Sequence, residues 1–319
     1  MRSPLAWTTT NRSSLVSEFI FVGFSGLPRF QLLLFMLVLS MYAVSLAGNT
    51  VITTIIRLNP VLHTPMYFFL TNLSLLEICY TTAIVPKMLA CLVSENKKIS
   101  LWGCATQMYF FTLFGIAECC LLAAMAYDRY VAICNPLRYT VVMNRVVCAQ
   151  LSVASWSVGV MVGLGQTNYV FSLTYCGPNR INHFFCDIPP LLTLACGDTS
   201  MNVIAVYMVA VLFITAPFLL ILTSYIYIIA SILRMPSAEG RHKAFSTCSS
   251  HLIVVSLFYG SGIITYLRPK SSYSAESDKL LSLFYTVVTS MLNPIIYSLR
   301  NKEVKVALKR MMVCRECLK

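Results

Sequence analysis

The sequence predicts an all-α membrane protein, a bundle of seven transmembrane helices, and three observations support this. The 319 residues are 57% hydrophobic and 11% charged, with a mean hydropathy of +0.73, which is not the composition of a soluble globular domain. Seven apolar runs are long enough to cross a bilayer. The basic residues are divided unevenly between the two sides of the membrane that these runs define.

The apolar runs divide the chain into three parts. Residues 1–27 form an extracellular tail, residues 28–299 the transmembrane bundle, and residues 300–319 a cytoplasmic amphipathic helix and tail. Residues 1–20 contain no apolar core of a signal peptide, so we expect the first span to direct insertion. The expected spans are 28–56, 64–91, 101–128, 146–171, 201–233, 248–267 and 280–299.

The distribution of charge predicts the orientation in the membrane. With the N-terminus outside, the cytoplasmic segments hold 14 bases and four acids, and the outer segments hold ten bases and six acids. Since cytoplasmic loops are enriched in Lys and Arg, this orientation is favoured. The net charge of +12 therefore indicates membrane topology and contact with anionic lipid. The sequence has no basic stripe of the kind that a soluble nucleic-acid-binding surface would carry, so nucleic-acid binding is not predicted.

The tail and the first span contain two polar signals. Asn11 begins a glycosylation sequon on the expected outer side. In the first span, Gly48 suits close packing between helices, and the neighbouring Asn49 needs a partner inside the bundle. Asn49 is expected either to hold helices together or to belong to a functional site.

Two acids are expected near the middle of the membrane, Glu77 in the second span and Glu118 in the third. A carboxylate at this depth is unfavourable unless it is paired, protonated or bound to a cation. With Asn49 and Asn293 nearby, the acids form a candidate site for a sodium ion or a shared proton. The alternative is a protonated pair without an ion. No other cofactor is indicated.

The third span ends in MAYDRYVAICNPLRY, residues Met125–Tyr139. Asp128 and Arg129 are adjacent at the membrane boundary, where each can shield the charge of the other. On an ideal helix, one face of this span carries a cysteine, apolar residues, an acid and the arginine, and it extends for about 37 Å. The residues of this face are Cys104, Phe111, Gly115, Glu118, Leu122 and Arg129.

Three further stretches accompany this motif in a fixed order. They are LHTPMYFFLTNLSLLEICY at the second span, KAFSTCSSHL at the start of the sixth, and NPIIY at the end of the seventh. In the sixth span, Leu257–Gly260 replaces the Trp-Pro pair of other rhodopsin-like receptors. Together the four stretches resemble the vertebrate olfactory receptors of the tetrapod class, rhodopsin-like receptors coupled to G proteins. The resemblance covers the whole chain.

The resemblance implies a receptor in the plasma membrane that activates a heterotrimeric G protein of the stimulatory olfactory type and raises cAMP. Four outer cysteines allow three pairings, and their spacing does not choose among them. The resemblance implies the pairs Cys104–Cys186 and Cys176–Cys196. The residues implied in G-protein coupling and activation are Asp128, Arg129, Tyr130, Tyr225, His251, Asn293, Pro294 and Tyr297.

A ligand site is expected in the outer half of the bundle. Phe111 stands where amine receptors have an aspartate, and the expected lining contains no Lys or Arg, so a charged ligand would lack a counter-ion. We expect a neutral, volatile, mostly hydrocarbon ligand with one alcohol, aldehyde, ketone or ester oxygen. The expected lining is Met108, Phe111, Thr112, Gly115, Ile116, Val209, Ala210, Phe213, Tyr259, Gly262, Ile263, Tyr266, Leu283 and Thr286.

Other functions have weaker support. One alternative is a rhodopsin-like receptor for a non-odorant metabolite, expressed outside the nose. A transporter would rest on Glu77 and Glu118 alone. The four histidines have no nucleophile and acid at a recognisable spacing, so an enzyme is not predicted. The segment from His183 to Asp187 has metal-ligand residue types, but a disulfide at Cys186 would remove its thiolate, and no metal site is predicted.

Overall fold

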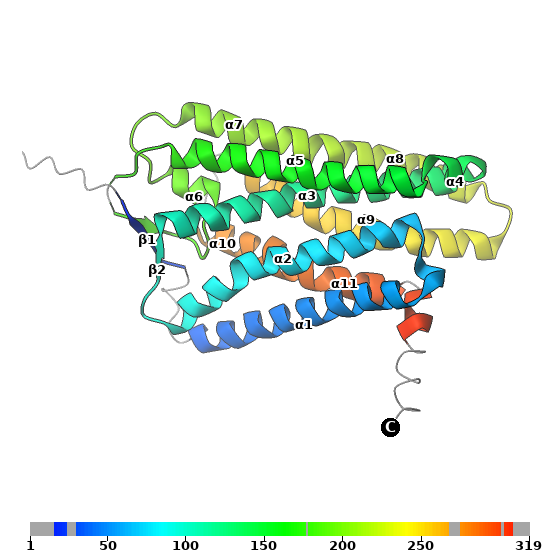
Figure 1. Ribbon diagram of the computed structural model, residues 1–319, viewed down its shortest axis with the longest axis horizontal. Coiled ribbons are helices and arrows are strands. Elements are labelled where there is room, and N and C mark those ends of the chain that lie inside the picture. The colour runs from blue at the N-terminus through cyan, green and yellow to red at the C-terminus, as the bar shows by residue number, and fades with distance from the viewer. Residues whose placement is uncertain (1–15, 24–29, 177, 268–274, 301–302, 309–319) are drawn as a thin grey trace, which may run out of the picture.

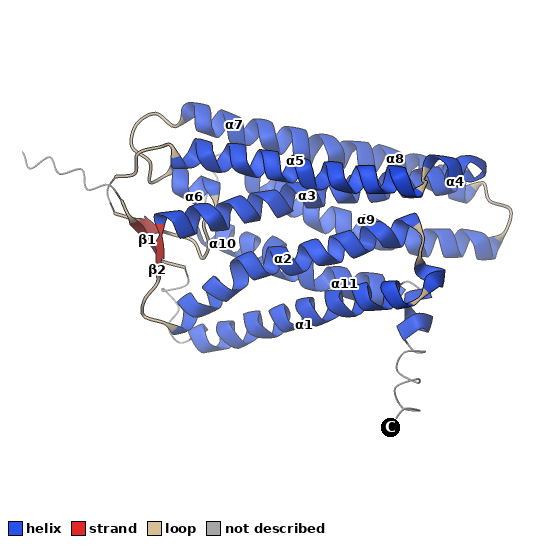
Figure 2. Ribbon diagram, viewed as in Figure 1, coloured by secondary structure: helices blue, strands red, loops and turns tan. Residues whose placement is uncertain are grey.

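Seven long apolar helices lie side by side along the long axis of the molecule (Figure 1). The computed structural model describes residues 16–23, 30–176, 178–267, 275–300 and 303–308, and this part is mostly helical (Figure 2). The predicted seven-helix bundle is confirmed. Five of the membrane helices are continuous: α1 (Gln31–Leu58), α2 (Pro65–Val93), α3 (Leu101–Cys134), α5 (Arg145–Phe171) and α9 (Ala238–Tyr266). The fifth membrane helix is made of α7 (Ser200–Ala210), η4 (Val211–Thr215) and α8 (Ala216–Leu233), and the seventh of α10 (Ala275–Leu283), η6 (Phe284–Val288) and α11 (Thr289–Arg300).

Polar caps and prolines set the ends of these helices. The side chain of Ser100 accepts a hydrogen bond from the backbone N–H of Gly103 and starts α3, and Asn144 accepts from two N–H groups at the start of α5. In the first turn of a helix the missing N–H of proline costs no hydrogen bond, so Pro65 begins α2. Helix α3 ends just before Asn135-Pro136.

Two helices extend beyond the expected apolar runs. Helix α3 continues six residues past the expected end at 128, and α9 begins at Ala238, ten residues before the expected start at 248. Hydropathy detects only the part of a helix that lies in lipid. The first turns of α9 are polar and are held by the cap of Ser237, whose side chain accepts from the N–H of Gly240 at 3.2 Å.

Helix α3 lies at the centre of the bundle, where its apolar stretch is 72% buried, compared with 11% for that of α1. Close packing against α5 depends on Gly159, because a Cβ atom there would lie 2.5 Å from the carbonyl oxygen of Leu113. Gly48 similarly lets α1 approach Pro294, whose ring lies 2.9 Å from the position of a Cβ. Small residues thus bring the helices together, as expected for a membrane bundle.

Two helices contain π-helical segments. In the fifth, η4 (Val211–Thr215) separates α7 (Ser200–Ala210) from α8 (Ala216–Leu233). In the seventh, η6 (Phe284–Val288) separates α10 (Ala275–Leu283) from α11 (Thr289–Arg300). A π turn holds one more residue than an α turn, so it changes which side chains face the bundle.

Loops and a small sheet close one end of the bundle, which we call the outer end. Strand β1 (Glu18–Phe21) pairs antiparallel with β2 (Lys98–Ser100) and parallel with β3 (Arg180–Ile181). The disulfide Cys104–Cys186 ties the long loop between α5 and α7 to α3, which confirms that pairing. A second disulfide links Cys176 with Cys196. The sequon at Asn11 lies outside the described residues.

The opposite, inner end carries short elements. These include α4 (Tyr139–Val142), two 3-10 turns, η2 (Pro60–Leu62) and η3 (Pro136–Arg138), and a helical segment at 303–308. Val304 and Ala307 are buried against the bundle, and the hydroxyl of Tyr67 donates to Glu303 at 2.8 Å. The N-terminal strand and this last helix lie at opposite ends of the bundle, as an odd number of spans requires (Figure 1).

Candidate ligand cavity and signalling site

A cavity lies between α3, α5, α7, α9 and the seventh helix. Aromatic rings form much of its wall: Phe111 stacks on Tyr80 with ring centroids 5.7 Å apart and contacts Tyr285 at 6.2 Å. The wall is almost wholly apolar, as is usual for small-molecule sites. Its lining residues are Tyr80, Phe111, Thr112, Gly115, Ile116, Cys119, Gln166, Ile188, Val206, Val209, Ala210, Ile214, Phe258, Gly262, Tyr266 and Tyr285.

The outer loop closes the cavity through a short helix, α6 (Ile188–Leu192), which contributes Ile188. Asp187 caps this helix and accepts from the N–H of Ile188 at 2.7 Å. Its carboxylate also accepts the hydroxyls of Tyr266 at 3.2 Å and Tyr285 at 3.3 Å. Burial raises the pKa of Asp187 to about 6, so the group is mostly ionised at neutral pH.

His183 supports the same loop. Its Nε2 lies 3.0 Å from the hydroxyl of Ser282 on α10, and its ring stacks on Phe184. Burial, with a smaller effect of Lys279, lowers the pKa of His183 to about 3, so the ring is neutral. His183, through Ser282, and Cys186, through its disulfide with Cys104, both attach the loop to the bundle.

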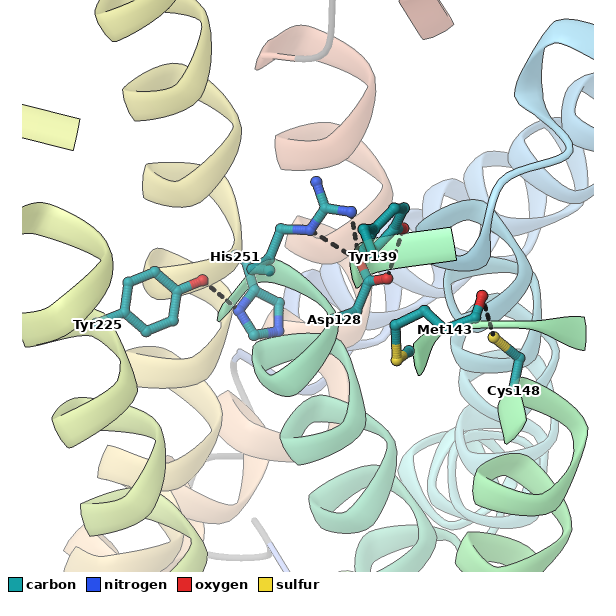
Figure 3. A network of polar contacts seen from close by, with 7 residues as sticks. Asp128, Tyr139, Met143, Cys148, Tyr225 and His251 are labelled. Carbon is teal, nitrogen blue, oxygen red and sulfur yellow. Dashed lines mark hydrogen bonds and ion pairs between the residues drawn. The ribbon is translucent and has the colours of Figure 1, made fainter. Parts of the chain in front are cut away.

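The inner end contains a cluster of polar contacts around α3 (Figure 3). Arg129 forms an ion pair with Asp128, and the two side chains are only 15% and 0% exposed. The hydroxyl of Tyr139, in α4, also donates to Asp128 at 2.8 Å. The arginine is thus paired with its neighbour and largely buried.

A second contact in this cluster joins the fifth and sixth helices. Tyr225 of α8 and His251 of α9 are hydrogen-bonded at 2.6 Å, with their rings stacked 5.8 Å apart (Figure 3). Nearby, Tyr297 is buried and its hydroxyl has no hydrogen-bond partner among the described residues. The contacts hold the inner ends of α8 and α9 together.

The two membrane acids meet between α2 and α3. Glu77 and Glu118 are buried and close enough to interact, and the Asn293 amide donates to Glu77. One oxygen each of Glu77, Glu118 and Asn293 has no hydrogen-bond partner in the described structure. Asn49 instead donates to the Ser45 carbonyl at 3.0 Å and to the Ser290 carbonyl at 3.5 Å.

The Asn49 contact has a structural cause. Pro294 has no N–H, so the carbonyl of Ser290, four residues earlier, loses its helical partner. The hydroxyl of Ser45 and the amide of Asn49 both donate to that carbonyl. Of the two roles considered for Asn49, these contacts are those of a residue that holds helices together.

Comparison with known proteins decides the family. A family profile described as olfactory receptor matches residues 38–315. The chain belongs to the olfactory receptor family. Human olfactory receptor 10A4 is 60% identical over 300 residues, 94% of this chain and 95% of that receptor. Human olfactory receptor 10A7 is 59% identical over 92% of this chain and 93% of its own length, and 10A5 is 57% identical over 95% and 97%.

This olfactory receptor is therefore a multi-pass protein with seven candidate spans, and the family implies the plasma membrane. Family membership confirms the predicted olfactory receptor function and excludes an enzyme. It also implies an odorant ligand and coupling to a G protein. The stretches quoted from the sequence had predicted the same family.

The cavity of the olfactory receptor contains eight of the residues expected from the sequence. These are Phe111, Thr112, Gly115, Ile116, Val209, Ala210, Gly262 and Tyr266. The residues that the sequence did not predict come partly from the loop, such as Ile188, and partly from helices two and four, such as Tyr80 and Gln166. One feature of the sequence could have indicated Tyr285 as a lining residue: it is a large polar aromatic residue in the outer half of the seventh helix.

Six of the expected residues lie outside this wall. Met108 is buried in the cluster beneath the outer loop, and the hydroxyl of Tyr259 donates to the Cys119 carbonyl at 2.7 Å. Thr286 donates to the Ser282 carbonyl at 2.6 Å. In the two π-helical segments, Ile214 lines the cavity where Phe213 was expected, and Tyr285 lines it where Thr286 was expected. The remaining residues outside the wall are Phe213, Ile263 and Leu283.

Proposed function

We propose that this receptor detects neutral, volatile, mostly hydrocarbon odorants in the cavity beneath the outer loop and activates a stimulatory G protein of the olfactory type. One observation carries the proposal: within the described residues, the cavity wall is apolar and contains no Lys, Arg, Asp or Glu. A carboxylate or an ammonium ion would enter without a counter-ion, at a cost of several kcal/mol. An apolar ligand gains about 25 cal/mol for each Å² that it buries.

The signalling step that we propose is a shift between two states. In the resting state Arg129 is paired with Asp128, and Tyr225 bonds to His251. An odorant that binds the open state more tightly moves the equilibrium by its difference in affinity. When α9 moves outward, Arg129, Tyr225 and Tyr297 become available to the G protein. This end of the bundle faces the cytoplasm, and the N-terminus lies outside the cell.

The proposal predicts a selective odorant response. In cells that express the receptor, a panel of neutral alcohols, aldehydes, ketones and esters should contain agonists that raise cAMP. Amines and short carboxylic acids of the same carbon skeletons should be silent, because the cavity offers them no counter-ion. Cells without the receptor are the control. Potent activation by the charged compounds, with neutral analogues silent, would contradict the proposal.

We further propose that the acid pair binds a sodium ion that favours the resting state. The three oxygens of Glu77, Glu118 and Asn293 without partners are ligands of the kind that hard cations prefer. Only these three oxygens carry the proposal, because Asn49 bonds elsewhere.

Replacing Glu118 with Gln should change basal cAMP and remove its dependence on sodium, measured with sodium replaced by choline. Thr53→Val is a matched control, because the Thr53 hydroxyl is also buried without a partner but belongs to α1, which carries neither acid. If basal cAMP and its sodium dependence are the same in Glu118→Gln as in the wild type, the pair is structural and binds no ion.

A further inference from the structure

Two residues that line the odorant cavity each carry a buried polar atom with no hydrogen-bond partner among the described residues. They are Oε1 of Gln166 on α5 and Oγ1 of Thr112 on α3. The Gln166 side chain belongs to a residue only 6% exposed, so bulk water does not serve this acceptor. A buried acceptor without a donor is unfavourable, and such groups in native proteins call for an explanation.

The tyrosines on the outer side of the cavity cannot supply a proton to a ligand. The hydroxyls of Tyr266 and Tyr285 both donate to the carboxylate of Asp187, at 3.2 and 3.3 Å. A phenol has one proton, so each oxygen keeps only its capacity to accept. Asp187 also accepts from the backbone N–H of Ile188, which fixes the carboxylate at the start of α6.

Neither of these tyrosines can therefore donate to Oε1 of Gln166. Gln166 presents a carbonyl oxygen, and the two tyrosines present oxygens whose protons are engaged. The hydroxyl of Thr112 can either donate or accept. An aldehyde, ketone or ester oxygen only accepts, so such a ligand would leave Gln166 without a donor.

We propose that the preferred odorants are alcohols, whose hydroxyl donates a hydrogen bond to Oε1 of Gln166. This inference rests on the proposed function and narrows its ligand class. The apolar wall receives the hydrocarbon part, and the hydroxyl donates to an acceptor that has no partner among the described residues. A site built to bond a hydroxyl discriminates strongly against an analogue that lacks it, whereas an apolar pocket discriminates weakly between ligands of similar shape.

The test compares primary alcohols with aldehydes of the same carbon skeleton, by half-maximal concentrations for cAMP in intact cells. On the wild type, the alcohols should be at least about tenfold more potent. Gln166→Leu keeps the approximate size but removes the acceptor, so it should weaken the alcohols by about tenfold and abolish the preference. Thr167→Val is the matched control on the same helix, since its hydroxyl is also buried without a partner but does not line the cavity.

A second variant, Asp187→Asn, tests the role of the two tyrosines. It also provides a test if Gln166→Leu fails to reach the cell surface. Asn at position 187 still caps α6, but its amide N–H₂ donates to one tyrosine and leaves that tyrosine's proton free for a ligand carbonyl. Asp187→Asn should therefore raise the potency of aldehydes relative to alcohols. An unchanged ratio in Asp187→Asn would contradict the inference.

Three outcomes separate this inference from the proposed function. Equal or greater potency of aldehydes on the wild type overturns the alcohol preference and leaves the neutral-odorant proposal standing. So does an alcohol preference that survives in Gln166→Leu at normal surface amounts. A wild-type receptor silent to every alcohol contradicts this inference, and silence to the aldehydes, ketones and esters as well contradicts both.

Discussion

Replacing Arg129 with Ala is expected to abolish odorant-driven cAMP while the amount of receptor at the cell surface stays unchanged. The Arg129 side chain is 15% exposed and is held at the inner end by Asp128, itself fixed by Tyr139. In the signalling step that we propose, release of this arginine offers the G protein a new contact in the open state. Without the guanidinium, the ligand still binds and α9 still moves, but the contact is lost.

The measurement is cAMP against agonist concentration, normalised to surface labelling. Arg138→Ala is a suitable control, because Arg138 is exposed in the neighbouring turn η3 and lies on the same side of the membrane. We expect Arg138→Ala to signal at close to the wild-type level. Full signalling by Arg129→Ala would refute the role assigned to the ion pair.

Gly159→Ala is expected to lower the surface amount and the thermal stability of the receptor. The added methyl group would lie 2.5 Å from the backbone oxygen of Leu113 and 3.2 Å from the Cβ of Ala117, so α5 must move away from α3. Overpacking of this kind typically costs about 1–3 kcal/mol, a large part of the stability of a folded protein.

Gly165→Ala provides the matched control on the same helix. A Cβ at position 165 has no heavy atom within 4 Å. Since Ala forms helices better than Gly by about 1 kcal/mol, this change should leave stability equal or slightly higher. Surface labelling and the melting temperature of purified receptor distinguish the two variants. Equal behaviour of both would show that the contact between α3 and α5 tolerates the extra methyl group.

The sequence predicted the membrane-embedded fold because lipid imposes a simple requirement, a long apolar helix for each crossing. It could not locate the start of α9, since the ten residues before 248 are polar and their helix depends on the Ser237 cap. The π-helical segments were also beyond prediction from an ideal period of 3.6 residues. They explain why Ile214 lines the cavity although Phe213 was expected to.

The two parts of the candidate site differ in how well they could be predicted. At the inner end, Asp128, Arg129 and His251 lie in stretches that resemble a known family, and the structure brings them into one cluster with Tyr225. In the cavity, the loop residue Ile188 was not predicted, nor was the role of Asp187, which accepts hydrogen bonds from two tyrosines of the wall. Their position depends on the disulfide at Cys186 and on contacts with residues distant in sequence, and neither can be derived from local patterns.

The central claim is that odorants act from inside the cavity, and filling that cavity tests it most directly. Gly115 lines the cavity on α3, and a Cβ there meets no heavy atom within 4 Å. Gly115→Leu should therefore fold, since it adds a good helix former without a clash at its Cβ, while its side chain occupies space that the ligand needs.

The decisive measurement is the cAMP response of Gly115→Leu to the agonists found for the wild type, with surface amount and basal cAMP recorded in parallel. We predict a loss of potency of about tenfold or more at unchanged surface and basal levels. Wild-type potency for every agonist in this variant would contradict the account, because the ligand would then bind elsewhere.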